Sequence, residues 1–213
     1  MTPPARRRRS DGEQTWRRVL DAAVGCILEV GYYQTSSNEI ARRAGVTWGT
    51  IQHQFGTREG LLLEVLNDRW AALDRRMAEA EVPDGTLEER LASVLDVLAS
   101  HYEQPEHLVQ LQIILDLTRN PNTSSETRQA IAVHGAELSR AWQPLFDQAL
   151  GEAASDPELV RYAFLALRGY LMGNVVSTNV ADTADDTVVR GLLVRGVAEA
   201  LRSEAARRGL ALA

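Results

Sequence analysis

The stretch TSSNEIARRAGVTWGTIQHQFGTRE, which begins at Thr35, constrains the fold of this chain more than any other. Its apolar residues recur four positions apart on either side of a glycine; they are Ile40, Ala44, Ile51 and Phe55. Residues spaced in this way share one face of a helix. Gly45 lies between the two pairs, and glycine adopts the positive φ of a tight turn without a Cβ clash. The stretch therefore predicts two short helices folded on each other, which is a helix-turn-helix.

The second of these helices has the side chains that reading DNA requires. Major-groove readout needs groups that project from one helix face and carry donors, acceptors or methyl groups. We expect the helix to begin at Thr47, a good N-cap residue, and to expose five residues. They are Trp48, Gly49, Thr50, Gln52 and His53. Trp48 is out of phase with the inward-facing Ile51, so we expect it to face outward rather than to pack against the first helix of the chain.

Residues 19–65 also resemble the N-terminal domain of the TetR family of transcriptional repressors. The family pattern combines paired alanines, Gly-aromatic, Thr-Ser/Thr, Ile-Ala, Ala-Gly-Val-Ser/Thr, Gly-Thr, Phe and a final Lys/Arg-Glu-x-Leu. The matching positions are Ala22, Ala23, Gly31, Tyr32, Thr35, Ser36, Ile40, Ala41, Ala44, Gly45, Val46, Thr47, Gly49, Thr50, Phe55, Arg58, Glu59 and Leu61. The resemblance covers about a fifth of the chain, and it implies a sequence-specific, DNA-binding transcriptional regulator.

The resemblance also assigns roles to individual residues. Those expected to contact DNA phosphates are Ser36, Thr47, Thr50, His53 and Arg58. Those expected nearest the bases are Trp48 and Gly49. The family usually has a tyrosine that contacts a phosphate where this chain has Gln52, whose amide can still donate a hydrogen bond to a phosphate or a base. One such unit contacts few base pairs, so useful specificity requires two units on an inverted-repeat operator in double-stranded DNA.

The charge distribution agrees with this expectation. The whole chain carries a formal charge of -6. Residues 1–60 hold nine arginines and six acidic residues, whereas the remainder holds fourteen arginines and twenty-three acidic residues. We therefore expect the N-terminal part to meet phosphate and the rest not to.

The chain is expected to be all-α, with about nine helices in three segments. Residues 1–9, with Pro3 and four consecutive arginines, are predicted to be a disordered basic arm, either simply solvated or adding contacts to DNA. Residues 10–56 are predicted to form a three-helix DNA-binding domain. Residues 57–213 are predicted to form a larger effector-binding and dimerisation domain. Pro144 lies inside one expected helix of this domain and predicts a kink or break.

The last two expected helices, at about residues 157–178 and 184–208, carry small and apolar residues along one stripe. The candidate dimer-interface positions are Ala163, Ala166, Gly169, Gly173, Leu192, Leu193, Gly196 and Ala200. Pairing these helices with their copies across a two-fold axis gives a homodimer through a four-helix bundle, which is also what the resemblance implies. The alternative is that they pack only within their own chain.

Isolated polar and aromatic residues of the expected second domain are candidates to line an effector pocket. They are Trp70, Tyr102, Gln112, Asp116, His134, Trp142, Phe146, Arg168 and Asn174. Each of them, taken singly, is also explained as core filler or surface. The resemblance implies that a small, largely apolar effector binds in this domain, shifts the long helix expected over residues 57–80 and releases the repressor from DNA.

Other classes of protein are not favoured. Cys26 is the only cysteine, no apolar run reaches about eighteen residues, and the N-terminus lacks the apolar region of a signal peptide. We therefore expect a cytoplasmic protein that makes no use of a membrane. No metal-ligand spacing, phosphate-binding glycine loop or acid/base pair is evident, so we expect no cofactor, no metal and no enzymatic activity. Two alternatives remain: a DNA-binding regulator whose C-terminal domain is only a dimerisation or protein-binding scaffold, and an all-helical enzyme with an incidental N-terminal resemblance.

Overall fold

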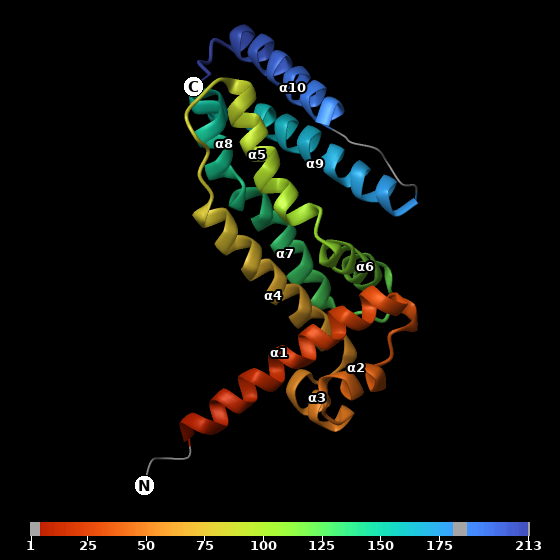
Figure 1. Ribbon diagram of the computed structural model, residues 1–213. Coiled ribbons are helices and arrows are strands. Elements are labelled where there is room, and N and C mark those ends of the chain that lie inside the picture. The colour runs from red at the N-terminus through yellow and green to blue at the C-terminus, as the bar shows by residue number, and fades with distance from the viewer. Residues whose placement is uncertain (1–4, 181–186, 213) are drawn as a thin grey trace. The chain divides into compact units, whose positions relative to one another are not determined.

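The computed structural model describes residues 5–180 and 187–212, and all regular elements in these ranges are helical (Figure 1). The α-helices are α1 Ala5–Val30, α2 Ser37–Ala44, α3 Trp48–Phe55, α4 Arg58–Glu79, α5 Leu87–Tyr102, α6 Pro105–Arg119, α7 Ser125–Ala141, α8 Gln143–Leu150, α9 Pro157–Val180 and α10 Thr187–Arg208. Two 3-10 helices, η1 Tyr32–Gln34 and η2 Gly151–Ser155, connect them. The all-α prediction is confirmed, with ten α-helices in the described ranges. The expected long helix breaks at Trp142, and Pro144 lies in the first turn of the separate helix α8.

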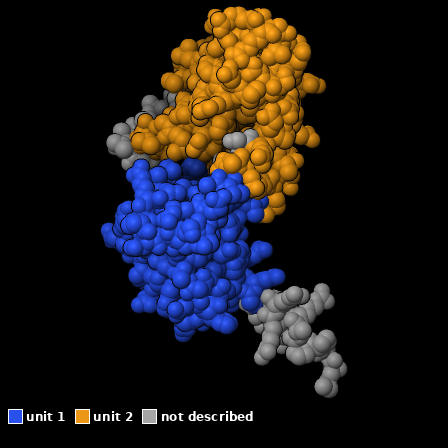
Figure 2. Space-filling model, turned by 180° about the vertical axis from the view of Figure 1, so that it is seen from behind, with its two compact units in different colours: residues 1–72, 105–134 blue, residues 73–104, 135–213 orange. Residues whose placement is uncertain are grey.

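The chain forms two compact units, coloured separately in Figure 2. Unit 1 comprises residues 1–72 and 105–134, and it contains α1 to α3, most of α4, α6 and the start of α7. In this unit α1 packs against α2 and α6, and α2 packs against α3 (Figure 1). Its core includes the apolar faces expected for the helix-turn-helix, with Ile40 and Ile51 both fully buried.

The core of unit 1 extends beyond the three N-terminal helices. Leu62 and Leu66 of α4 and Val109 and Ile113 of α6 belong to the same hydrophobic cluster as Ile40. Three helices alone bury little apolar surface, and α4 and α6 add to it. The compact unit is therefore larger than the segment 10–56, whose limits as a functional domain stay a prediction.

The N-terminal prediction is wrong in part. Helix α1 begins at Ala5, so residues 5–9 are helical rather than a disordered arm, and residues 1–4 lie outside the described residues. Arginine has a high helix propensity, and the sequence has no proline after Pro4 before the expected start of the helix. The run of arginines therefore extends α1 toward the N-terminus.

Unit 2 comprises residues 73–104 and 135–213. Its core is formed by α5, α8, α9 and α10, with α5 packed against each of the other three. Helix α5 begins with a capping box, in which Thr86 accepts a hydrogen bond from the Glu89 amide and the Glu89 carboxylate accepts one from the Thr86 amide. Fully buried leucines along α5, such as Leu91 and Leu98, fill the space between the helices.

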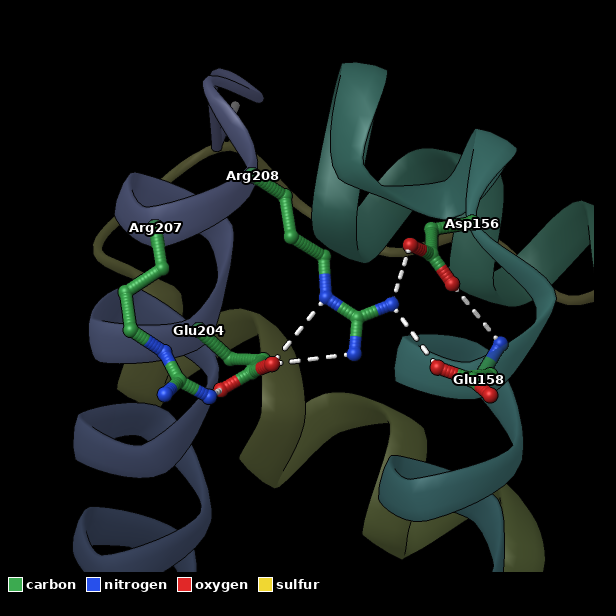
Figure 3. A network of polar contacts seen from close by, with 5 residues as sticks. All are labelled: Asp156, Glu158, Glu204, Arg207 and Arg208. Atoms are coloured by element: carbon green, nitrogen blue, oxygen red, sulfur yellow. Dashed lines mark hydrogen bonds and ion pairs between the residues drawn. The ribbon is translucent and has the colours of Figure 1, made fainter.

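The end of α10 is held to the start of α9 by Arg208 (Figure 3). Its Nη1 lies 2.6 Å from Asp156 Oδ2 and 2.9 Å from Glu158 Oε2, and its Nη2 lies 2.9 Å from Glu204 Oε1. Arg207 contacts the other oxygen of Glu204. Arg208 lowers the pKa of Asp156, and Arg207 and Arg208 together lower the pKa of Glu204. The network therefore links the C-terminal end of α10 to the N-terminal end of α9 while Asp156 and Glu204 are ionised.

Candidate DNA-binding site and effector-domain clusters

Local hydrogen bonds fix the positions of α2 and α3. Ser36 accepts a hydrogen bond from the Glu39 amide at the start of α2, and Thr47 accepts one from the Thr50 amide at the start of α3. Between the helices Gly45 adopts a φ of 67°, and the Val46 amide donates to the Ala41 carbonyl at 3.0 Å. This is a glycine-ended helix followed at once by a capped one. The turn therefore has the geometry that its sequence predicts.

The outward face of α3 presents most of the predicted DNA-contacting residues. The exposed members of that set are Ser36, Thr47, Gly49, Thr50, Gln52 and His53. The hydroxyl groups of Thr47 and Thr50 lie 3.0 Å apart at the first turn of α3. Donors and a helix N-terminus at one surface suit an anionic backbone such as that of DNA.

Trp48 differs from its expectation. It is half-buried and packs against the hydrophobic core of unit 1 rather than projecting wholly outward. It lies three residues before the buried Ile51, a spacing that places both side chains on one helix face, so the expected outward phase was wrong. Its packing role, which the sequence argument had set aside, is thus present in the structure.

Arg58 also has partners within the protein. Its Nη2 donates to the carbonyls of Tyr32 at 3.3 Å and Thr35 at 3.1 Å, and its guanidinium carbon lies 5.0 Å from the centre of the Tyr32 ring. The side chain therefore fixes the segment between α1 and α2. A phosphate contact of the kind the resemblance implies requires Arg58 to share or exchange these bonds.

Two other arginines of the helix-turn-helix are engaged by acidic residues. Arg43 lies 2.7 Å from Glu29 and 2.8 Å from Glu39, and Arg42 lies 2.7 Å from Glu39. Hydrogen bonds from Arg42 and Arg43 lower the pKa of Glu39 to about 2. These arginines therefore stabilise the end of α2, where the helix dipole also favours positive charge.

The nine candidate effector-pocket residues fall into two groups, one in each unit. Four belong to unit 1, namely Trp70, Gln112, Asp116 and His134, and five belong to unit 2, namely Tyr102, Trp142, Phe146, Arg168 and Asn174. In unit 1, Trp70 stacks on His134 with ring centres 3.7 Å apart. Gln112 and Asp116 line an open surface cleft of about 610 Å³ beside η1.

The unit 2 group contains an aromatic cluster. The Tyr102 and Trp142 rings are stacked with centres 6.2 Å apart, and Trp142 lies 5.8 Å from Phe164. The guanidinium carbon of Arg168 lies 5.4 Å from the Tyr102 ring centre and 5.8 Å from that of Phe164. Phe146 meets Phe164 edge to face. Phe164 was absent from the predicted set, although its spacing of four from Arg168 on one helix face would have suggested it.

Comparison with known proteins agrees with this geometry. Residues 19–65 match the family model described as "Bacterial regulatory proteins, tetR family", and these residues include α2, α3 and their caps. The HTH-type transcriptional regulator BetI of Escherichia coli is 39% identical over 85 residues, which cover 38% of this chain and 42% of BetI. The chain therefore carries, in residues 19–65, the domain typical of TetR-family regulators. It is a DNA-binding transcriptional regulator.

Similarity to other regulators of this kind extends beyond the N-terminal unit. The fatty acid metabolism regulator protein of Bacillus subtilis is 28% identical over 194 residues, which cover 85% of this chain and 95% of that protein. The crystal structure of the regulator FadR from Bacillus subtilis in complex with stearoyl-CoA matches with a TM-score of 0.59 and 22% identity, covering 87% of this chain and 97% of that one. The latter likeness shows that the TetR-family regulator shares its fold with FadR.

The structure also shows polar contacts of the regulator that the sequence argument missed. The Tyr32 hydroxyl donates to Asp116 Oδ2 at 2.6 Å, and burial together with this bond raises the pKa of Tyr32. Ser124, which precedes α7, donates from its hydroxyl to Glu59 at 2.6 Å and accepts from the Thr127 amide. Within unit 1, the first pair joins η1 to α6, and the second joins the start of α4 to the residue before α7. They are separated by 84 and 65 residues, so no local pattern could have revealed them.

The predicted dimer positions of the regulator differ in exposure. Ala163 is fully buried within its own unit, which leaves its methyl group no surface for a partner. The exposed positions are Gly169, Gly173, Leu192 and Gly196, and the half-buried ones are Ala166, Leu193 and Ala200. Further exposed apolar residues on the same two helices are Tyr162, Leu165, Val176, Val188 and Val189.

Within the described residues, no group of three or more His, Cys, Asp or Glu side chains is placed to hold a metal ion. None of the helices that the structure describes is both long and apolar enough to span a membrane. The similar proteins named above are regulators rather than enzymes.

Proposed function

We propose that this TetR-family regulator is a homodimeric repressor that binds an inverted-repeat operator and is released from it by a small, largely apolar effector. The observation that carries the DNA-binding part is the capped first turn of α3, which presents Thr47 and Thr50 at an exposed surface beside Gln52. Because its target is DNA, we place the regulator in the cytoplasm.

In this proposal the residues of the face have separate roles. Ser36, Thr47, Thr50 and His53 position the helix through phosphates, and Gly49 allows close approach of the α3 backbone to the bases. Gln52, which is exposed where the family usually has tyrosine, contributes to sequence preference. Base contacts specify sequence, whereas phosphate contacts mainly set affinity and register.

The operator sequence is accessible by selection from random duplex DNA, and we expect a palindromic site. Gln52→Ala should weaken operator binding by roughly tenfold, as expected for loss of a polar contact to DNA. Gln54→Ala is a matched control because Gln54 is also exposed on α3 but lies two residues away, on another helix face. Equal affinities for the two variants would refute the assigned role of Gln52.

Salt dependence tests the phosphate contacts as a group. If roughly six phosphates are neutralised, affinity should fall on the order of a thousandfold between 50 and 200 mM salt. A complex whose affinity is indifferent to salt would contradict the proposed mode of binding.

The proposal of a dimer rests on the exposed stripe of α9. Tyr162, Leu165, Gly169, Gly173 and Val176 recur at spacings of three or four and so share one helix face. A Cβ added at Gly169 or Gly173 would meet no atom within 4 Å, so the packing of the protomer does not require glycine there. Glycine on an exposed apolar face allows another helix to approach closely, which suits pairing with a second copy.

Sedimentation of a glycine variant tests this interface. Gly173→Leu should fit the protomer but hold the partner helix away, giving monomers and loss of operator binding. Gly135→Leu is the matched control, since a Cβ there also meets no atom within 4 Å and Gly135 lies on α7, outside the proposed interface. A Gly173→Leu protein that remains dimeric would place the interface elsewhere.

Thermodynamic linkage sets the condition under which an effector releases the regulator from DNA. An effector weakens DNA binding only if it prefers the form that does not fit the operator, and the operator must then weaken effector binding by the same factor. A thermal-shift screen of apolar small molecules, followed by operator displacement, would identify it. Effector affinities that are equal with and without operator would favour the alternative in which the C-terminal domain is only a scaffold.

A further inference from the structure

The aromatic cluster of unit 2 contains a buried donor with no described acceptor. Trp142 is 1% exposed, and its Nε1 has no hydrogen-bond partner among the residues that the structure describes. Buried N–H groups in native proteins are nearly always paired, and leaving one unpaired costs about 1–3 kcal/mol. An unpaired indole N–H in this position therefore suggests a role beyond packing.

Arg168 is the second donor of the cluster. It is half-buried on α9, its Nε is buried, and no carboxylate or carbonyl of the described residues contacts its guanidinium. Other arginines of unit 2 do have acidic partners, such as Arg190 with Asp96 at 2.5 Å and Arg202 with Glu88 at 2.5 Å. The charge of Arg168 is instead held between the rings of Tyr102 and Phe164.

The two donor side chains contact the same two aromatic rings. Arg168 contacts the rings of Tyr102 and Phe164 at 5.4 and 5.8 Å, and Trp142 contacts the same two rings at 6.2 and 5.8 Å. One cationic donor and one neutral donor thus adjoin the same pair of aromatic rings. Aromatic walls exclude water, and a hydrogen bond to a charged group is stronger where water is excluded.

We propose that Arg168 and the Trp142 Nε1–H bind an anionic oxygen of the effector, while the apolar part of the effector packs against Tyr102, Phe146 and Phe164. This inference rests on the proposed effector binding and specifies its chemistry: an anionic amphiphile. The anionic oxygen belongs either to a carboxylate at the end of an apolar chain or to a phosphate of a larger conjugate.

Other ligand classes fit the cluster less well. A cationic ligand would be repelled by Arg168, whose guanidinium already occupies the ring positions suited to a cation. A neutral hydrocarbon would bury the indole N–H and the guanidinium further without supplying an acceptor, which is unfavourable. An anionic ligand supplies the acceptors that the two donors lack.

The experiment compares ligands of equal chain length that carry either an anionic or a neutral head group. Binding of decanoate and of decan-1-ol to the full-length dimer is measured by calorimetry at pH 7.5, below the concentrations at which either aggregates. We expect the wild-type protein to prefer decanoate by roughly tenfold or more, the range expected for hydrogen bonds to a charged group. Decanoyl-CoA forms the third arm, because its anionic oxygens lie on phosphates and not at the end of the chain.

Variants assign that preference to the two donors. Arg168→Met should lose the preference for decanoate while its affinity for decan-1-ol changes less than about threefold, and Arg168→Lys should keep part of it. Trp142→Phe, which keeps an aromatic ring and removes the N–H, should lose a smaller part of the preference for decanoate. Arg161→Met is the matched control, since Arg161 is an exposed arginine seven residues earlier on α9. Each variant is also tested for operator binding, which a merely unfolded protein would lose.

The outcomes separate this inference from the proposed function. If decanoate and decan-1-ol bind equally and Arg168→Met changes neither, the anionic class is wrong, whereas an apolar effector remains supported. If only decanoyl-CoA binds and Arg168→Met weakens it, the inference holds and the anionic oxygen is a phosphate. If none of the three binds or displaces operator DNA, both the effector proposal and its anionic class are overturned for acyl ligands.

Discussion

The DNA-binding face of unit 1 and the aromatic cluster of unit 2 are built in opposite ways. The face is formed by residues that lie close together in the sequence, at the starts of α2 and α3 and along α3. Hydrogen bonds between residues three positions apart hold it in place. The cluster joins Tyr102 of α5, Trp142 between α7 and α8, and Arg168 of α9. The face is therefore readable from local spacing, whereas the cluster exists only when distant helices pack.

The largest expected effects test whether the two regions have separate cores. Ile51→Ala in unit 1 and Leu98→Ala in unit 2 each empty a fully buried position. Each should lower the free energy of unfolding by about 2–5 kcal/mol. Because the residues belong to different clusters, the effects should add in the double variant to within about 0.5 kcal/mol, measured by urea denaturation. A larger discrepancy would show that the two cores are coupled.

A smaller effect is expected from the contact between Tyr32 and Asp116. Tyr32→Phe removes a 2.6 Å hydrogen bond to a carboxylate and should destabilise unit 1 by about 1–2 kcal/mol. Tyr33→Phe should have no measurable effect, because Tyr33 is 89% exposed. Adding Asp116→Asn to each variant completes a double-mutant cycle. An additive cycle would mean that the bond contributes nothing to the DNA-binding unit.

The cap of α3 should contribute somewhat less. Thr47→Ala removes the acceptor for the Thr50 amide and should cost about 1 kcal/mol of stability, whereas Thr47→Ser should keep most of it. Operator affinity should follow the same order, since the capping hydroxyl also lies on the DNA-binding face. If Thr47→Ser binds operator as poorly as Thr47→Ala, the methyl group and not the cap determines binding.

The smallest effect concerns the exposed network around Arg208 in unit 2. The folded-state pKa values of Asp156 and Glu204 are lowered, so these carboxylates add stability above their ordinary pKa of about 4 and lose it as the pH falls through the folded-state values. Arg208→Met should thus be less stable than wild type at pH 7, and the difference should narrow below about pH 4. Thermal melts across this range measure it.

Arg207→Met provides the comparison for that network. Arg207 contacts only Glu204 within the network, and its side chain is 71% exposed, so its replacement should change the pH profile less. Equal profiles for the two variants would show that the contact of Arg208 with α9 adds no stability of its own.

The sequence-based predictions were accurate where the interacting residues lie close together in the sequence. Gly45, Ser36 and Thr47 act on neighbours within four residues, and the turn they predict is present. Trp48 lies three residues before Ile51 and seven before Phe55, so helix phase in fact places it on their inward face. Arg58 was assigned by resemblance, and its partners Tyr32 and Thr35 lie more than twenty residues away in the sequence. The run of arginines near the N-terminus was interpreted from composition, although the backbone of residues 5–9 is helical.

The candidate effector residues show the same limit at longer range. Residue type singled out Tyr102, Trp142 and Arg168, and the fold brings these together in unit 2. The same criterion also singled out Asp116, whose described hydrogen bond is to Tyr32 in unit 1. Polar and aromatic residues within helices are candidates for a pocket, but their type does not say which helix they will face.

The sequence by itself determined the all-helical class, the helix-turn-helix and its exposed face, because helix caps, glycine turns and apolar periodicity act over one or two helical turns. Only the tertiary structure decided how the core of the DNA-binding unit extends into α4 and α6, and which donors gather around Tyr102 and Phe164. Such contacts join residues tens of positions apart, and they depend on how whole helices pack rather than on any local pattern.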